Sequence, residues 1–80
     1  MKEIVFTAAA AKQRAKLDAK VRARIDAKLD TFATTGQGDV KRLAGRDGAR
    51  LRFGDWRVLF FEDRGAIVVV AVGHRREVYD

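Results

Sequence analysis

The hydrophobic periodicity of the chain changes at its midpoint, and this change most constrains the fold. Between residues 18 and 35, apolar side chains recur every three or four positions, at Val21, Ile25, Leu29 and Phe32, as on one face of an amphipathic helix. Beyond residue 48, β-branched, aromatic and arginine residues lie between short glycine-containing turns, as in an antiparallel meander. Helical and then strand-like segments predict an α+β domain.

The N-terminal half completes this expected order of elements. Residues 2–6 alternate and favour a short strand, and Thr7 stands immediately before a run of alanines as a helix cap. Asp18 is placed to cap the second helix, and Gly36 and Gly38 are placed to end it. We therefore expect an N-terminal strand, a two-helix hairpin and then an antiparallel β-meander, with the helices packed on one sheet face.

The expected turns define registers for the meander. A two-residue loop at Gly54-Asp55 places Arg52 opposite Arg57. A three-residue loop at 63–65 pairs Glu62 with Ala66 and Arg57 with Ala71. Because side chains alternate across a strand, the face that packs on the helices would collect Leu51, Phe53, Trp56, Val58, Phe60, Val68, Val70 and Val72. The opposite face would collect Arg50, Arg52, Arg57, Leu59, Phe61, Ile67, Val69, Ala71 and Gly73, joined by Arg75 if the strand continues.

Length, charge and cysteine content bound the class of protein. Residues 1–80 are of a size for one domain. The chain has no cysteine and no apolar run long enough for a membrane span or a signal peptide, so we expect a cytoplasmic protein without a membrane partner. Its net charge of +6 and pI of about 10.3 favour a nucleic-acid partner over charge that serves only solubility.

The facing pair Arg52 and Arg57 is unfavourable in a sheet, because like charges directly opposite each other repel. A phosphate between the two guanidinium groups would turn the repulsion into charge-assisted hydrogen bonds, with Arg50 and Arg75 close enough to enlarge the cluster. The alternative is that each arginine reaches solvent or meets an acidic residue such as Asp55, Glu62 or Glu77.

Most catalytic arrangements are excluded by composition. The chain has no serine or cysteine nucleophile, and with one histidine it has no multi-histidine metal site; we expect no metal and no cofactor. Arginines suit cleavage of an RNA phosphodiester, in which the 2′-hydroxyl is the nucleophile and the protein stabilises charge on the phosphorane. Proton transfer then falls to His74, Glu77 or Tyr79, although strand parity turns His74 away from Arg57.

Four apolar residues on the arginine-bearing face predict a second feature. Leu59, Phe61, Ile67 and Val69 would form an exposed apolar patch, and such patches usually mark a protein interface. Alternatively, the loop containing Lys41-Arg42-Leu43 or the first strand covers the patch.

Two segments of the chain resemble the RelE toxins of the RelE/ParE superfamily. They are Leu51-Arg52-Phe53-Gly54-Asp55-Trp56-Arg57-Val58-Leu59-Phe60 and Val72-Gly73-His74-Arg75-Arg76-Glu77-Val78-Tyr79. The resemblance implies a bacterial toxin that cuts messenger RNA in the ribosomal A site. It further implies a cognate antitoxin that wraps the toxin, with operator DNA contacted only through the antitoxin complex.

The resemblance also assigns roles to residues. It implies that Arg50, Arg52 and Arg57 grip and polarise the phosphate, that Arg75 belongs to the same site, and that Tyr79 stacks on or orients a base. Some relatives carry lysines in place of Arg50 and Arg52, so the proton acceptor stays open and His74 gains weight.

The expected catalytic residues are thus Arg52, Arg57, Arg75, Tyr79 and His74. The expected substrate-binding residues are Arg50, Arg76, Lys41, Arg42 and Arg46, and the expected antitoxin-binding residues are Leu59, Phe61, Ile67 and Val69. Two alternatives on the same fold stay open: a ParE-like toxin that inhibits gyrase, and a non-catalytic nucleic-acid-binding or regulatory member.

Overall fold

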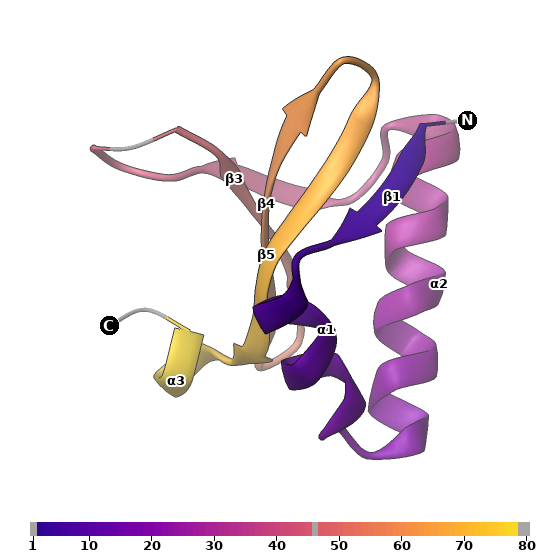
Figure 1. Ribbon diagram of the computed structural model, residues 1–80, viewed down its shortest axis with the longest axis vertical. Helices are drawn as coiled ribbons and strands as arrows, with labels where there is room; N and C mark the ends of the chain where they lie inside the picture. Colours follow the sequence, from indigo (N-terminus) through magenta and orange to yellow (C-terminus); the bar gives the residue numbers. More distant parts are fainter. Residues whose placement is uncertain (1, 46, 79–80) are drawn as a thin grey trace.

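The computed structural model describes residues 2–45 and 47–78, which form one five-stranded sheet with helices (Figure 1). The elements in chain order are β1 (Glu3–Phe6), α1 (Ala8–Ala15), α2 (Ala19–Thr35), β2 (Asp39–Arg42), β3 (Ala49–Phe53), β4 (Trp56–Asp63), β5 (Ala66–His74) and α3 (Arg75–Val78). The strand order is β1-β5-β4-β3-β2, with β1 parallel to β5 and all other pairs antiparallel. The expected α+β fold is confirmed; β2 was not predicted as a strand.

The helix boundaries follow the predicted caps. Thr7 Oγ1 accepts a hydrogen bond from Ala10 N at 3.2 Å, and Asp18 Oδ2 accepts one from Lys20 N at 3.1 Å. Gly36 ends α2 in the left-handed region, with φ of 76°. None of the helices in the described part of the chain has the length and hydropathy needed to cross a bilayer.

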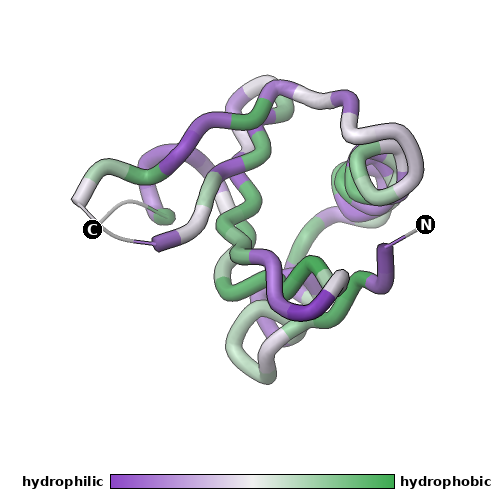
Figure 2. Tube along the Cα trace, turned by 90° about the horizontal axis from the view of Figure 1, so that it is seen from above, coloured by the Kyte–Doolittle hydropathy of each residue, from purple (hydrophilic) through white to green (hydrophobic). Residues whose placement is uncertain are grey.

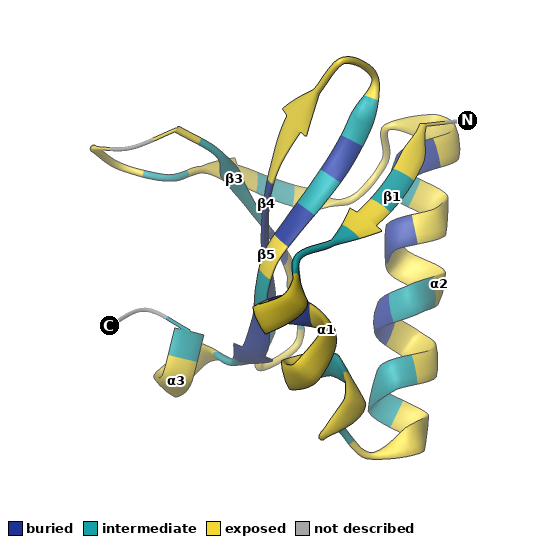
Figure 3. Cartoon of the chain, viewed as in Figure 1, coloured by how far each residue is buried: buried dark blue, intermediate teal, exposed yellow. Residues whose placement is uncertain are grey.

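The core lies between α2 and one face of the sheet. Ile25 and Leu29 on α2 are buried against residues such as Leu51 and Val58 (Figure 3). Helix α1 is held to the sheet by Gln13, whose Oε1 accepts a hydrogen bond from the backbone N–H of Val72 at 2.8 Å. Figure 2 shows that apolar segments of the sheet and of α2 face each other across this layer. The expectation that the two-helix hairpin covers one sheet face is therefore confirmed for α1 and α2.

A charged clamp joins the two helices. Arg14 on α1 donates from both Nε and Nη2 to the carboxylate of Asp26 on α2, with an Nε to Oδ1 distance of 2.9 Å. The hydrogen bond to Asp26 is the largest cause of a raised pKa for Arg14. Bidentate pairs of this kind fix geometry as well as charge, so the clamp defines how α1 sits on α2.

The first hairpin has the predicted register. Gly54-Asp55 is a two-residue turn, and it places Phe53 opposite Trp56, Arg52 opposite Arg57 and Leu51 opposite Val58.

The second hairpin differs from the prediction in turn length and register. Its turn is two residues, Arg64 and Gly65, with φ of 50° and 82°, as the hairpin turns that match strand twist require. Asp63 consequently pairs with Ala66, and a register irregularity between Leu59 and Phe60 shifts the pairing by one more residue. The predicted three-residue loop is wrong. Arg57 faces Gly73, not Ala71.

Because of this register, several side chains of β5 lie on the sheet face opposite to the predicted one. Ile67 and Val69, predicted for the exposed patch, have no exposed surface because they pair with Ile4 and Phe6 of β1 and point into the core. Conversely Val70, predicted for the core, is 36% exposed. Leu59 is also buried, so the predicted exposed patch of Leu59, Phe61, Ile67 and Val69 is wrong for all but Phe61, which is 40% exposed.

The register predicts that truncating Ile67 and truncating Val70 lower the free energy of unfolding by different amounts. Ile67→Ala should lower the free energy of unfolding by about 2–5 kcal/mol, because it leaves a cavity in a closed core. Val70→Ala should change it by about 0.5 kcal/mol or less, as expected for an exposed site. Urea titrations of the two variants would measure both costs. Equal costs would contradict the observed pairing of β4 with β5.

Candidate functional site

Arg52 and Arg57 face each other beside the β3–β4 turn, on the sheet face opposite α2. Arg52 is exposed, and its Nε lies 3.1 Å from Asp39 Oδ2 on β2. Arg52 thus has Asp39 on one side and Arg57 on the other. The unpredicted strand β2 supplies the acid that partly compensates the like-charged pair.

Arg57 is buried, with 6% of its surface exposed. Its Nη1 donates to the backbone carbonyls of Gly54 at 2.8 Å and Trp56 at 2.9 Å. Its Nε has no hydrogen-bond partner among the described residues. A buried donor without an acceptor is costly, so Arg57 both braces the turn and retains one unsatisfied donor.

Arg75 is held at the same turn by Asp55. Strand β5 ends at His74 and α3 begins with Arg75, so the strand does not continue through Arg75, and Arg75 reaches the site from α3 instead. The backbone N–H of Arg75 donates to the carbonyl of Asp55 at 2.7 Å, and Arg75 Nε lies 3.7 Å from Asp55 Oδ1. Asp55 therefore anchors the closing segment to the β3–β4 hairpin.

The closing helical turn α3 folds back over the sheet next to Arg57. Gly73 pairs with Arg57 across the strands, and a Cβ atom at Gly73 would lie only 2.8 Å from Val78 Cγ2. Figures 1 and 2 show α3 on the opposite side of the sheet from α2. A glycine is needed at position 73 because the turn approaches the strand this closely.

His74 lies away from the arginines. It pairs with Trp56, and the two rings meet edge to face, with centroids 5.6 Å apart. His74 Nδ1 accepts a hydrogen bond from the backbone N–H of Arg76 at 3.3 Å. Strand parity places His74 on the face opposite that of Arg57, so the structure does not bring these two expected catalytic residues together.

Three of the expected substrate-binding residues, Lys41, Arg42 and Arg50, lie on β2 and β3. Lys41 pairs directly with Arg50, which in turn pairs with Leu59. Arg76 is exposed on α3. Arg46 and Tyr79 lie outside the described residues.

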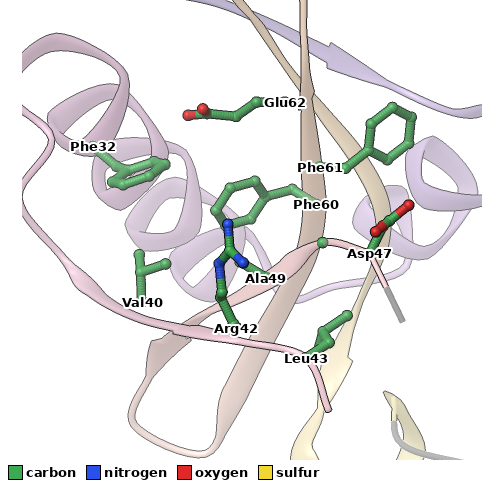
Figure 4. A pocket seen from close by; sticks show the side chains of 10 residues that line it. Phe32, Val40, Arg42, Leu43, Asp47, Ala49, Phe60, Phe61 and Glu62 are labelled. Carbon is green, nitrogen blue, oxygen red and sulfur yellow. The ribbon is translucent and has the colours of Figure 1, made fainter. Parts of the chain in front are cut away.

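A separate open groove of about 750 Å³ lies between the end of α2, β2 and the outer half of β4 (Figure 4). Its walls include Phe32 and Phe60, whose rings are 5.3 Å apart. Arg42 and Phe61 also line it, together with Val40, Leu43, Asp47, Gly48, Ala49 and Glu62. The groove was not predicted from the sequence, because Asp39-Val40-Lys41-Arg42, the strand that forms one wall, contains one apolar residue and gives no alternating pattern.

Solved structures share this arrangement of elements. The isolated E. coli RelE toxin matches with a TM-score of 0.80 and 20% identity over 92% of this chain and 84% of that chain. A chain of the intact E. coli RelBE toxin–antitoxin complex matches with a TM-score of 0.79 and 22% identity over 92% and 96%. A chain of the RelB–RelE complex from Methanococcus jannaschii matches with a TM-score of 0.77 and 21% identity, covering 95% of each chain. The fold is that of the RelE toxins.

The family assignment comes from the sequence. The model of the ParE toxin of the type II toxin–antitoxin system parDE matches residues 4–79. The chain belongs to this family, and with it to the RelE/ParE superfamily of toxins. No curated protein sequence matches the chain significantly.

The packing of α3 predicts coupling between Gly73 and Val78. Gly73→Ala should lower the free energy of unfolding by about 1–3 kcal/mol, because the added methyl group meets Val78. In a Val78→Ala background the same substitution should cost less, since the obstructing methyl group is gone. A double-mutant cycle by thermal or urea unfolding measures the coupling. An identical cost in both backgrounds would show that the turn does not pack on Gly73.

Proposed function

We propose that this toxin is an endoribonuclease that cuts messenger RNA in the ribosomal A site. The observation that carries the proposal is that three arginines are held at the β3–β4 hairpin, two on its strands and one on α3. Arg52 and Arg57 face each other across it, and Arg75 is bound to its turn through Asp55. The resemblance of both segments to RelE toxins assigns the same three residues to one site.

Cleavage of RNA by its own 2′-hydroxyl requires only positive charge and proton transfer from the protein. The 2′-hydroxyl of RNA attacks the adjacent phosphate, and hydrogen-bond donors stabilise the charge that develops there. The ion pairs of Arg52 and Arg75 are exposed and therefore weak, so a phosphate can replace the carboxylates. Arg57 is held in place by the bonds of Nη1 to the turn and adds buried positive charge next to Arg52.

Proton transfer is assigned by elimination. Arginine stays protonated at neutral pH, and His74 lies on the opposite sheet face against Trp56. Glu77 lies on α3, which Asp55 anchors through Arg75, and Tyr79 follows this helix in the sequence. We therefore favour these two residues over His74 for proton transfer, with Tyr79 also stacking on a base.

Substitution of the exposed arginines tests the proposal. Arg52→Ala with Arg75→Ala should reduce cleavage of a translated message at least about 100-fold, since one such donor is worth about 10²–10³ in rate. Primer extension on messenger RNA in a translation extract measures the cut. A Lys12→Gln, Arg64→Asn variant removes the same charge elsewhere and should cut normally. Cleavage that survives in the first variant would contradict the proposal.

An alternative function is inhibition of DNA gyrase, as for a ParE-like toxin. It is favoured by the finding that Arg52, Arg57 and Arg75 each already have acceptors within the chain, as a binding protein without a phosphate site would. Induction of the wild-type toxin distinguishes the two: DNA damage with continuing protein synthesis supports the alternative, and immediate arrest of translation supports the ribonuclease.

We further propose that the toxin acts in the cytoplasm and has a cognate antitoxin, which alone brings it to operator DNA. The groove in Figure 4 suits an antitoxin segment, because its aromatic floor is open and its lining includes basic Arg42 as well as acidic Asp47 and Glu62. Phe61 is the one expected antitoxin-binding residue that is exposed, and it lines this groove.

Phe61→Asp should weaken the complex with the antitoxin encoded beside this gene at least about tenfold, because aromatic anchors dominate such interfaces. Val70→Asp is the matched control: Val70 is similarly exposed but does not line the groove. Titration calorimetry measures both affinities. If Val70→Asp weakens binding and Phe61→Asp does not, the antitoxin occupies another surface.

A further inference from the structure

The net positive charge of the chain is concentrated away from the sheet. Residues 12–24, which span the corner between α1 and α2, contain six basic residues and one acidic residue. This segment therefore carries five of the six net positive charges of the whole chain. The arginines beside the β3–β4 turn account for little of the excess, because Asp39 and Asp55 accompany them.

Helix α2 has two flanks of different charge. One flank carries Lys20, Arg24 and Lys28, which follow one another at intervals of four residues and are all exposed. None of the three forms an ion pair with another described residue. The other flank carries Arg22, Asp26 and Asp30, and its Asp26 is bound by Arg14. Only the first flank, which we call the cationic flank, is left without compensating charge.

The four-residue spacing of the cationic flank destabilises helix α2 when no partner is bound. Like charges four residues apart on a helix repel and destabilise it. A row of negative charges would convert this repulsion into attraction. Successive members of the flank rise by about 6 Å along the helix axis, a spacing on the scale of successive phosphates along a nucleic-acid strand.

The cationic flank ends at aromatic side chains. Lys28 Nζ lies 5.8 Å from the centre of the Phe53 ring, and Phe53 pairs with Trp56 across the β3–β4 turn. Both rings are half-buried. Proteins that bind single strands combine cationic tracks with aromatic side chains on which bases stack. Phe53 also follows Arg52 directly, so the flank leads to the hairpin that carries the candidate cleavage site.

We propose that Lys20, Arg24 and Lys28 form a docking track for the phosphate backbone of a nucleic acid, separate from the arginines that act on the scissile phosphate. An acidic protein partner fits less well, because protein interfaces are anchored by large apolar side chains. The exposed large hydrophobic residues of the described chain are Val5, Phe61 and Val70, and none is on α2. Binding along the track requires no cleavage chemistry.

The salt dependence of binding tests the track. The triple variant Lys20→Gln, Arg24→Gln, Lys28→Gln preserves helix propensity while removing three cations. Its affinity for a fluorescent single-stranded RNA with 2′-O-methyl groups, which cannot be cut, is measured by anisotropy between 50 and 300 mM KCl. Loss of three phosphate contacts should flatten the slope of log K against log salt by about 2. A DNA duplex of equal length, measured in parallel, shows whether the track prefers RNA.

A second triple variant, Lys12→Gln, Lys16→Gln, Arg64→Asn, is matched in charge and should leave the slope within about 1 of the wild type. Equal flattening in both triples would overturn the proposal, because net charge alone would then explain binding. It is also overturned if the flank variant binds both nucleic acids normally but loses binding to a polyglutamate peptide. An Arg52→Ala, Arg75→Ala protein that fails to cut RNA but keeps the wild-type slope leaves the docking track supported, so cleavage and docking are tested separately.

Discussion

The pairing of β4 with β5 determines most of what the rest of the molecule can do. These strands lie inside the sheet, with β1 beside one and β3 beside the other. The two-residue turn at Arg64-Gly65 directs Ile67 and Val69 into the core. The irregularity between Leu59 and Phe60 then restores an inward direction for Val72 and places Gly73 opposite Arg57. The same pairing thus selects the core residues and positions the arginine site.

The irregularity has a clear physical role. A regular ladder from the Arg64-Gly65 turn would put Val70 and Val72 on the same face as Phe61, and the strand would present apolar residues to solvent over its whole length. Inserting one residue near Val70 changes the side-chain phase once. The first half of β5 can then pack against β1 while its second half packs under α1, where Gln13 binds Val72.

The two hairpins show what a sequence can and cannot specify here. Gly54-Asp55 admits a two-residue loop with little ambiguity, so the facing arginines were predicted correctly. Asp63-Arg64-Gly65 is compatible with loops of two or three residues, because a positive φ at arginine is uncommon but allowed. A slip of one residue moves every side chain to the other face, so this single choice misplaced Ile67, Val69 and Val70. Strand β2 was missed because it is short, polar and at an edge, where packing gives no apolar pattern.

At the candidate site too, features set by neighbouring residues could be predicted from the sequence, whereas contacts between distant residues could not. Parity along β5 was sufficient to turn His74 away from Arg57. The contact of Arg75 with Asp55, twenty residues earlier, depends on where the strand ends, and no local pattern encodes it. Two of the arginines at the β3–β4 hairpin are paired with acids within the fold: Asp39 meets Arg52, and Asp55 meets Arg75. Lys20, Arg24 and Lys28 have no such acids among the described residues. Since an uncompensated row of like charges disfavours its own helix, the cationic flank is better explained by an external polyanion than by the stability of the fold.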